Sequence, residues 1–297
     1  MLKTVVMQGK VVVITGATSG IGEVAAQKLA AMGARIVMIA RNSERAASTL
    51  SRLRQIAPGV EHRVHYADLS RLGEMRRVAR QIALAEPHID VLINNAGAAF
   101  DRRQVNEEGI ELTFATNHLS YFVLTEGLRE SLLAAGAARI VNTSSEAHRR
   151  AKLDFDDLQF TKRYRLFAAY GRSKLCNILF TRELARRLEK NAVTANCLHP
   201  GFVATRFGDN NRGPVSYLFR FAKIFALSPE KGAETIVYLA SSNDVANSNG
   251  QYFYKCRPLA PSKEAQDDVA ARRLWEETER LAKIFPSFEE GPPRRSN

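Results

Sequence analysis

Val11-Val12-Val13-Ile14-Thr15-Gly16-Ala17-Thr18-Ser19-Gly20-Ile21-Gly22 is the stretch that decides the fold of this chain. Its four apolar residues, 11–14, are typical of a strand buried on both faces of a parallel sheet. Three glycines follow with the spacing GxxxGxG, and residues 22–33 then have the apolar periodicity of a helix. A glycine-rich turn that opens a helix offers free backbone N–H groups and the positive end of the helix dipole to a phosphate. The stretch therefore predicts a strand, a phosphate-binding turn and a helix.

The alternation of short apolar strands with amphipathic helices continues along the chain. We expect strands at 11–14, 35–40, 64–68, 90–94, 138–143, 193–198 and 251–254. We expect helices at 22–33, 43–55, 72–85, 109–135, 170–190, 229–241 and 265–284. Strands that alternate with helices predict an α/β fold: a single Rossmann-type, doubly wound parallel sheet flanked by helices, with right-handed crossovers.

The chain shows no repeat and no linker rich in Gly, Ser or Pro, so we expect its 297 residues to form one domain. The core is expected at about 9–285. Residues 146–167 interrupt the alternation, residues 202–228 are expected to form a helical excursion, and the tail 291–297 is expected to be disordered.

Composition narrows the class of protein. Hydrophobic residues make up 45% of the chain, enough for a sizeable core. The three cysteines, Cys176, Cys197 and Cys256, are odd in number and widely spaced, which argues against a disulfide framework or a metal site and favours a reducing compartment. Residues 1–9 lack the long apolar segment of a signal peptide or membrane anchor, and we expect an untargeted, cytoplasmic protein.

The chain is strongly basic, with a net charge of +12 and a pI near 9.8. Most basic residues are arginines scattered along amphipathic helices, and no aromatic residues are interleaved with them in a basic stripe. We therefore expect a solvated basic surface and no nucleic-acid partner, with part of the excess charge attracting an anionic dinucleotide.

Tyr170 and Lys174 are the strongest candidates for chemistry. They are four positions apart on a predicted helix, so the phenol and the ammonium share a face and can point into one cleft. A neighbouring cation stabilises a phenolate, and we expect Lys174 to lower the pKa of Tyr170. A positioned tyrosine of this kind can give or take a proton at neutral pH.

Three motifs, in this order, resemble those of the short-chain dehydrogenase/reductase family: TGxxxGIG at 15–22, NNAG at 94–97 and YxxxK at 170–174. The resemblance covers about residues 9–281. More narrowly, the stretches IVNTSSEAH at 140–148, SKLCNILF at 173–180 and LWE at 274–276 are similar to those of the retinol dehydrogenase-like branch. The long spacer between the serines and Tyr170 is also similar to that branch.

The resemblance implies four catalytic residues. Tyr170 would be the acid in carbonyl reduction and the base in alcohol oxidation, and Lys174 would lower its pKa and bind the nicotinamide ribose. Ser145 would hydrogen-bond the substrate oxygen; Ser144 is its rival, and the family's spacing favours Ser145. Asn117 would hold a water of a proton relay, unless it is a structural residue that bends its helix.

The resemblance also implies a set of cofactor contacts. Besides Tyr170 and Lys174, the implied residues are Gly16, Thr18, Ser19, Gly20, Ile21, Gly22, Arg41, Asp68, Leu69, Asn94, Ala96, Gly97, Pro200, Gly201, Val203 and Thr205. Gly16 permits the tight turn, and Gly20 and Gly22 let the pyrophosphate and the helix approach closely. Asp68 and Leu69 would meet the adenine, although plain strand-end capping remains an alternative for Asp68. The segment from Asn94 would line the adenosine ribose and support the sheet.

The end of the second strand bears on the choice of cofactor. An acid there accepts bonds from the 2′-hydroxyl of NAD, but this chain has Arg41 and no acid until Glu44. A guanidinium can clamp a 2′-phosphate. The sequence therefore predicts NADP(H) rather than NAD(H).

The resemblance implies that residues 202–228 cover the substrate as a lid. Their aromatic content, which includes Phe207, Tyr217, Phe219, Phe221 and Phe225, implies a bulky lipophilic aldehyde, ketone or alcohol. Basic residues in the same segment leave two interpretations open: peripheral contact with an anionic membrane, or an amphipathic helix packed on the core. The resemblance implies dimers or tetramers, but less consistently in this branch.

Two other functions stay open at this point. One is reduction of a conjugated C=C bond, as in the related protochlorophyllide reductases. The other is a non-catalytic, nucleotide-bound scaffold or sensor, against which the retention of Ser145, Tyr170 and Lys174 argues.

Overall fold

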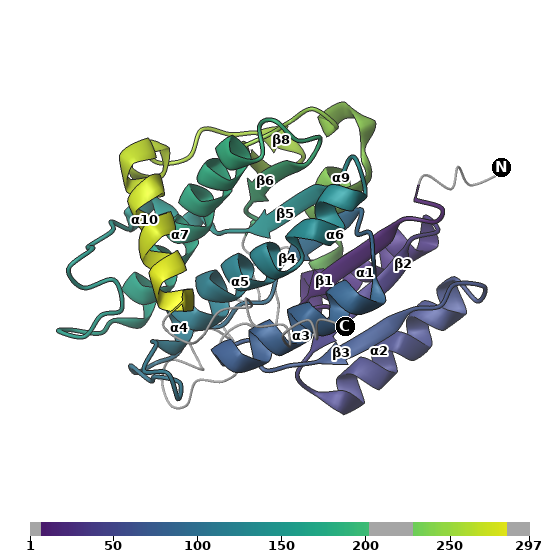
Figure 1. Cartoon of the computed structure of the whole chain (residues 1–297), viewed down its shortest axis with the longest axis horizontal. Coiled ribbons are helices and arrows are strands. Elements are labelled where there is room, and N and C mark those ends of the chain that lie inside the picture. Colours follow the sequence, from purple (N-terminus) through teal and green to yellow (C-terminus); the bar gives the residue numbers. More distant parts are fainter. Residues whose placement is uncertain (1–6, 202–227, 284–297) are drawn as a thin grey trace, which may run out of the picture.

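The computed structural model describes residues 7–201 and 228–283 of the chain. Its strands form one sheet in the order β3-β2-β1-β4-β5-β6-β7-β8, parallel except for the last pair (Figure 1). The strands are Val11–Thr15 (β1), Arg35–Ala40 (β2), Arg63–Tyr66 (β3), Val91–Asn94 (β4), Arg139–Thr143 (β5), Thr194–Leu198 (β6), Tyr252–Tyr254 (β7) and Arg257–Pro258 (β8). From β1 the strand order runs to β2 and β3 on one side and to β4, β5 and β6 on the other. The strand order therefore reverses between β1 and β4, and open α/β sheets bind their ligands at such a switch point. The α/β, doubly wound fold is confirmed.

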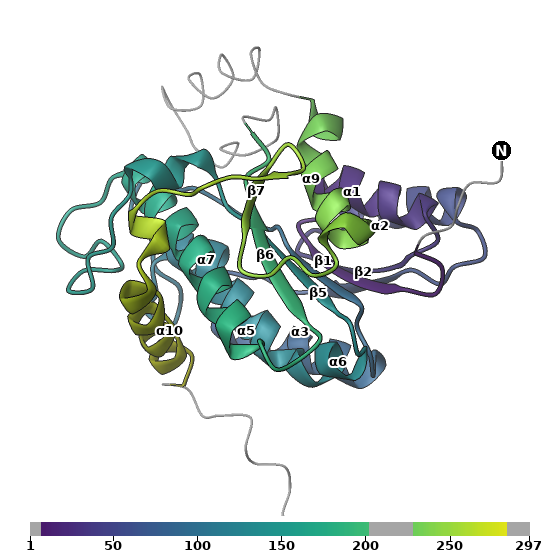
Figure 2. The ribbon, with the colours of Figure 1, turned by 90° about the horizontal axis from the view of Figure 1, so that it is seen from above.

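Helices cover both faces of the sheet (Figure 2). The α-helices are Gly20–Ala31 (α1), Ser43–Ile56 (α2), Leu72–Ala85 (α3), Leu112–Phe114 (α4), Ser120–Gly127 (α5), Arg129–Ala134 (α6), Leu166–Arg187 (α7), Pro229–Ser241 (α9) and Asp268–Lys283 (α10). Short 3₁₀ segments lie at Glu146–Arg150 (η2), Asn243–Val245 (η4) and Glu264–Gln266 (η5), and a π segment at Ala115–Leu119 (η1). One core cluster joins α1, α2 and α9 to the sheet; the other joins α3, α5, α7 and α10.

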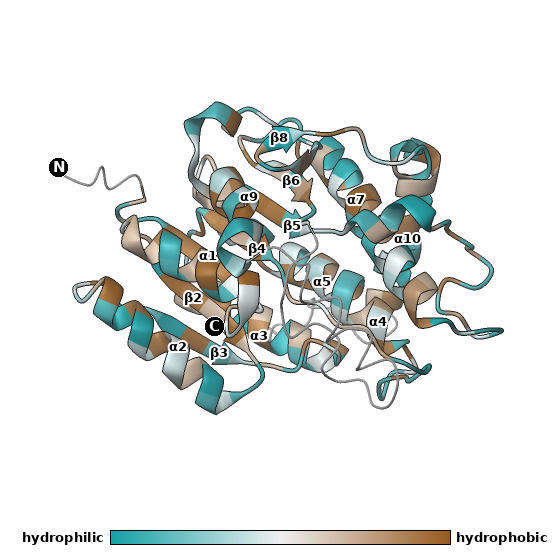
Figure 3. Ribbon diagram, turned by 180° about the vertical axis from the view of Figure 1, so that it is seen from behind, coloured by the Kyte–Doolittle hydropathy of each residue, from teal (hydrophilic) through white to brown (hydrophobic). Residues whose placement is uncertain are grey.

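The central strands are apolar on both sides because each side faces a helix layer. In β1, Val11 and Val13 pack into one cluster, whereas Val12 and Ile14 pack into the other, as the two-residue period of a strand requires. Figure 3 shows hydrophobic residues concentrated along these strands, and hydrophilic residues on the outward faces of helices such as α2. The apolar run that began the sequence is therefore a strand buried on both faces.

A layer of buried polar side chains crosses the core between the sheet and helices α5 and α7. The Asn94 amide donates to Thr125 Oγ1 at 3.2 Å and to Asn142 Oδ1 at 2.9 Å, and Asn142 donates to Thr181 Oγ1 at 3.0 Å. Buried amides are costly unless they are paired, so this chain of bonds fixes β4, β5 and the two helices in one register.

Most elements lie where the sequence predicts them, but the helix expected at 109–135 does not run through. It is divided into α4, a π turn, α5 and α6, with a break at Leu128. A Cβ at Gly127 would lie 2.7 Å from the Cβ of Ala79, so the close approach of α3 fixes this end of α5. The sequence also did not predict β8, because this strand is two residues long and exposed.

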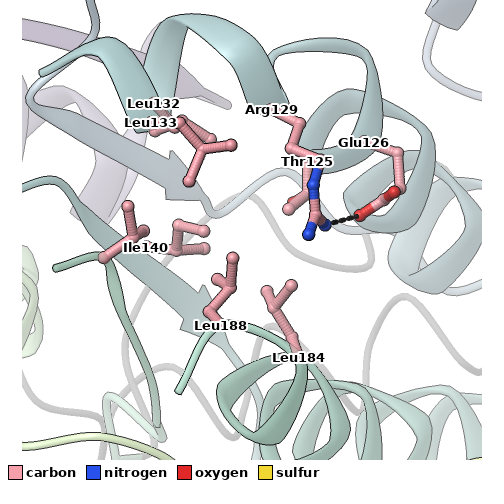
Figure 4. Close-up of a pocket in the computed structure, with 9 residues that line it drawn as sticks. Thr125, Glu126, Arg129, Leu132, Leu133, Ile140, Leu184 and Leu188 are labelled. Atoms are coloured by element: carbon pink, nitrogen blue, oxygen red, sulfur yellow. Dashed lines mark hydrogen bonds and ion pairs between the residues drawn. The ribbon is translucent and has the colours of Figure 1, made fainter. Parts of the chain in front are cut away.

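Two cavities among the described residues lie away from the switch point. One, between α5, α6, β5 and α7, holds about 10 Å³ and has the Arg129–Glu126 ion pair at its side (Figure 4). That volume admits about one water molecule. The other, an open groove of about 340 Å³, lies at the amino ends of the strands, beside Val11 and Arg35. Within 7–201 and 228–283, no helix has the length and apolarity needed to cross a bilayer.

Candidate active site

The glycine turn lies at the carboxyl end of β1, where φ is +68° at Gly16 and +57° at Gly20. Both values belong to the left-handed region that favours glycine. A Cβ at Gly22 would lie 2.3 Å from the carbonyl oxygen of Gly16, so the third glycine lets α1 start against the turn. Helix α1 begins two residues earlier than predicted, at Gly20, with Ser19 as its N-cap.

The turn is tied to the end of β4 by Thr15 and Asn95. Thr15 Oγ1 accepts the backbone N–H groups of Asn95 at 2.8 Å and Ala96 at 2.9 Å. The Asn95 side-chain amide donates in return to the carbonyls of Thr15 at 3.2 Å and Gly16 at 3.4 Å. These bonds hold the carboxyl ends of the two central strands together.

Asn95 was missed from the sequence, which pointed to its neighbour Asn94. The Asn94 side chain is fully buried in the polar layer, where its amide donates to Asn142. The alternation of side chains along β4 could have identified Asn95. Ile93 packs on the side of the sheet that faces α1, and Asn95, two residues further on, faces the same side. Ala96 and Gly97 follow in the cleft, and Ala96 is fixed by the Tyr121 hydroxyl, which donates to its carbonyl at 2.9 Å.

Lys174 projects from α7 to the end of β5. Its side chain is 3% exposed, and Nζ donates to the carbonyl of Thr143 at 3.0 Å. Burial lowers the pKa of Lys174 to about 8, partly opposed by the neighbouring Cys197 thiol. A Cβ at Gly97 would lie 3.4 Å from Nζ, so the glycine of NNAG lets the chain pass close to the ammonium.

The two candidate serines have different partners. Ser144 is buried and its hydroxyl donates to the carbonyl of Lys174 at 2.7 Å. Ser145 is half-buried, and its hydroxyl interacts with that of Tyr170, which lowers the tyrosine's pKa in part. Ser144 thus fixes α7 against β5, whereas the hydroxyl of Ser145 contacts that of Tyr170. The choice of Ser145 as the residue that binds the substrate oxygen stays a prediction.

Tyr170 differs from expectation in its ionisation. Burial raises its pKa to about 12, and only the Ser145 hydrogen bond opposes that rise. The prediction that Lys174 lowers this pKa is therefore wrong for the chain by itself. The ammonium lies 5.7 Å from the centroid of the phenol ring and is bonded to the sheet. The phenol is a protonated acid at neutral pH.

Asn117 lies in the middle of the π turn between α4 and α5. Its amide donates to the carbonyl of Ala98 at 2.9 Å and to Ser173 Oγ at 2.9 Å, and its oxygen accepts from Ala98 N–H at 2.7 Å. The residue is fully buried. These bonds support the structural interpretation, a residue that shapes its helix, and they leave the proton-relay role a prediction.

Three of the cofactor candidates, Arg41, Asp68 and Leu69, follow strands β2 and β3. Arg41 follows β2 directly and is exposed, and Asn42 caps α2 by accepting from the backbone N–H of Arg45 at 2.8 Å. Asp68 closes a local turn, because its carboxylate accepts from Ser70 N–H and Oγ at 3.0 and 2.8 Å. The capping alternative for Asp68 is therefore present, and Leu69 beside it is buried.

The loop after β6 carries the remaining candidates. Pro200 and Gly201 are half-buried, and the Gly201 N–H donates to His199 Nδ1 at 3.2 Å, with φ of +83° at the glycine. Val203, Thr205 and residues 202–227 of the predicted lid lie outside the described residues, and Ser228, the last residue of that prediction, is the N-cap of α9.

The residues present fit a dinucleotide. Within the described residues the Ser19 side chain makes no capping bond, so the first N–H groups of α1 are left to an anion. A Cβ at Gly16 would meet Asn95 Nδ2 at 2.9 Å, and one at Gly97 would crowd Lys174 and Asn117. The turn would hold the pyrophosphate, and the Lys174 and Tyr170 end of the cleft would hold the nicotinamide riboside.

A model of the family described as short chain dehydrogenase matches residues 10–214. A crystal structure of an uncharacterised protein from Mycobacterium paratuberculosis superposes with a TM-score of 0.74 at 31% identity, over 93% of this chain and 94% of that one. The Pseudomonas aeruginosa RhlG/NADP active-site complex superposes with a TM-score of 0.66 at 25% identity, over 85% and 97%. The chain belongs to the short-chain dehydrogenase/reductase family and is a hydride-transferring oxidoreductase.

Its branch follows from curated relatives. Human retinol dehydrogenase 14 is 42% identical over 289 residues, covering 92% of this chain and 86% of the relative. Human retinol dehydrogenase 13 is 39% identical over 291 residues, covering 96% and 88%. The chain is a member of the retinol dehydrogenase-like branch, as its SSEAH and LWE stretches predict.

Proposed function

We propose that the chain is an NADP(H)-dependent reductase of lipophilic carbonyl compounds, working also on the matching alcohols, with Tyr170 as the proton donor and acceptor. The observation that carries the proposal is the contact between the hydroxyls of Ser145 and Tyr170, with the Lys174 ammonium fixed on the same helix face. A carbonyl oxygen that meets both hydroxyls is polarised and receives a proton from one of them. The bound nicotinamide supplies the hydride.

The ionisation of the site favours reduction. Because burial raises the pKa of Tyr170 to about 12, the phenol keeps its proton at neutral pH and is ready to give it to the oxygen as negative charge develops there. Oxidation of an alcohol needs the phenolate, which the positive charges of Lys174 and of the oxidised nicotinamide favour. The oxidation state of the bound nicotinamide would therefore decide whether Tyr170 donates or accepts the proton.

The preference for NADP(H) rests on Arg41, exposed at the end of β2, where the sequence offers a guanidinium in place of an acid. The lipophilic substrate class rests on the relatives, which are named retinol dehydrogenases. We propose a retinoid-like aldehyde or ketone as the first compound to test. The cytoplasmic location, the membrane contact and the oligomer stay predictions.

The test is a Tyr170→Phe variant assayed with all-trans-retinal, a 3-ketosteroid and a short aldehyde, at saturating NADPH. Loss of the proton donor is expected to lower kcat by about 10²- to 10⁴-fold, with the NADPH dissociation constant, measured by calorimetry, unchanged. Tyr238→Phe on the half-buried outer part of α9 is the matched control and keeps its activity.

Two results would redirect the proposal. Turnover of Tyr170→Phe at the rate of the parent protein would remove Tyr170 from the chemistry. Binding of NADPH without turnover of any carbonyl by the parent chain would favour the scaffold or sensor, and consumption of protochlorophyllide in the light would favour the C=C reductase.

A further inference from the structure

His148 belongs to the SSEAH stretch at 144–148, and the proposed chemistry assigns no role to its side chain. It lies in η2, the single 3₁₀ turn that follows Ser145 directly, and its side chain is fully buried. The ring packs edge-on against Tyr252 of β7, with centroids 5.1 Å apart and planes at 70°. A buried imidazole this close to a candidate catalytic serine needs an account of its hydrogen bonds.

The neighbours of the ring determine which nitrogen carries the proton. His148 Nε2 lies 3.2 Å from the backbone nitrogen of Ser262, which can only donate. In the neutral ring Nε2 is therefore the acceptor, and the hydrogen is on Nδ1. Nδ1 lies 2.7 Å from the carbonyl oxygen of Ser145, which can only accept. Both contacts are satisfied by one tautomer, and by that one alone.

The bond from Nδ1 acts on the residue that we place against the substrate oxygen. The Ser145 carbonyl also accepts the backbone N–H of His148 at 3.1 Å, and Ser145 Oγ accepts that of Ala147 at 3.3 Å. A turn of five residues has few backbone bonds of its own. The imidazole adds a side-chain bond at one end and links the turn to Ser262 at the other.

The ring is neutral because of its surroundings. Burial lowers the pKa of His148 and Arg149 lowers it further, while the hydrogen bond to the Ser145 carbonyl and the carboxylates of Glu146 and Glu264 raise it. The charged and titratable groups that face the ring are Glu146, Arg149, His199, Tyr252 and Glu264. Protonation would place a hydrogen on Nε2 against the Ser262 N–H and so break that contact.

We propose that His148 is a positioning residue: its Nδ1–H holds the Ser145 carbonyl, and with it the turn that presents the Ser145 hydroxyl to Tyr170 and the substrate. This inference rests on the proposed function, because it assigns to Ser145 the binding of the substrate oxygen.

The two amide variants of His148 separate its two bonds. His148→Asn places an amide near the position of Nδ1 and keeps the donor to Ser145, whereas His148→Gln places an amide oxygen near Nε2 and keeps the acceptor for Ser262. We expect the Asn variant to keep kcat for all-trans-retinal within about threefold. We expect the Gln variant to lose about 10- to 100-fold in kcat, with the dissociation constant for NADPH unchanged.

A double-mutant cycle with Ser145→Ala distinguishes positioning from general stability. If His148 acts through Ser145, His148→Gln lowers kcat in the parent protein and has no further effect in the Ser145→Ala background. Additive losses, or equal losses in the Asn and Gln variants, would overturn the inference.

The two failures can be told apart. Full turnover by Ser145→Ala would contradict the proposed function itself. Loss of turnover by Ser145→Ala together with an unaffected His148→Gln would contradict the positioning role alone.

Discussion

Replacing Lys174 with methionine is expected to stabilise the folded chain at pH 7 while abolishing turnover. Burial lowers the pKa of Lys174 from 10.5 to about 8. Each tenfold change in an ionisation constant corresponds to about 1.4 kcal/mol, so the charged lysine costs the fold about 3 kcal/mol at neutral pH. Methionine has nearly the same shape and carries no charge.

The gain is smaller than that cost because one hydrogen bond disappears with the ammonium. The bond from Nζ to the Thr143 carbonyl is worth about 2 kcal/mol, as a bond made by a charged group. The carbonyl is not left unpaired, since the Asn177 amide also donates to it, at 3.1 Å. The net stabilisation expected of Lys174→Met is therefore about 1 kcal/mol.

The pKa of Lys174 also determines whether the stability of the folded chain rises or falls with pH. Between about pH 8 and 10.5 the unfolded chain binds the Lys174 proton and the folded chain does not, so this group makes stability rise with pH. Buried Cys176 and Cys197, whose pKa values rise to about 12, act in the opposite direction above pH 9. The difference between the variant and the parent cancels the cysteines and isolates Lys174.

Urea unfolding at pH 7 and pH 9.5, with the exposed Lys231→Met as the matched control, measures that difference. The advantage of Lys174→Met is expected at pH 7 and should be lost or reversed at pH 9.5, while the control stays within about 0.5 kcal/mol of the parent at both. A variant that is less stable than the parent by the same amount at both values would refute a strained, buried ammonium.

Three further substitutions test the cofactor end, the turn and the serines. Arg41→Ala is expected to raise KM for NADPH about 10- to 100-fold and to leave KM for NADH unchanged; equal changes for both cofactors would contradict a 2′-phosphate clamp. Gly22→Ala places a Cβ 2.3 Å from a carbonyl oxygen and should cost several kcal/mol, about 3 or more, in urea unfolding, whereas Gly59→Ala, with nothing within 4 Å, should be nearly neutral. Ser145→Ala is expected to lower kcat about 10²-fold, and Ser144→Ala to lower stability by about 1 kcal/mol while sparing kcat; the reverse pattern would exchange their roles.

The sheet was predictable because its strands are apolar runs separated by glycines and helices. Strands such as Val11–Thr15 and Arg35–Ala40 differ from their predicted limits by one residue or none. The apolar pattern of a segment does not show which other elements that segment contacts. The helix expected at 109–135 is interrupted because Asn117 bonds Ala98, and because α3 approaches Gly127.

The site was predictable where its residues form a motif in the chain. Gly16, Ser145, Tyr170 and Lys174 gather at the carboxyl ends of β1 and β5 as their order implies. Partners that belong to no motif were missed, since they meet only across strands. The Asn95 amide reaches the turn after β1, eighty residues earlier in the chain than Asn95 itself.

The helical spacing of Tyr170 and Lys174 explains why they share a cleft, but the sheet decides what each can do there. Lys174 donates to a carbonyl at the end of β5, and burial raises the pKa of Tyr170, so that the phenol keeps its proton at neutral pH. Both ionisations therefore depend on burial: it favours the protonated phenol and disfavours the ammonium. A bound dinucleotide would change this balance, because ribose hydroxyls would give the ammonium new partners and a positive nicotinamide ring would favour the phenolate. Under the proposed function, the fold would therefore prepare the pair to donate a proton, and the oxidised cofactor would prepare it to accept one.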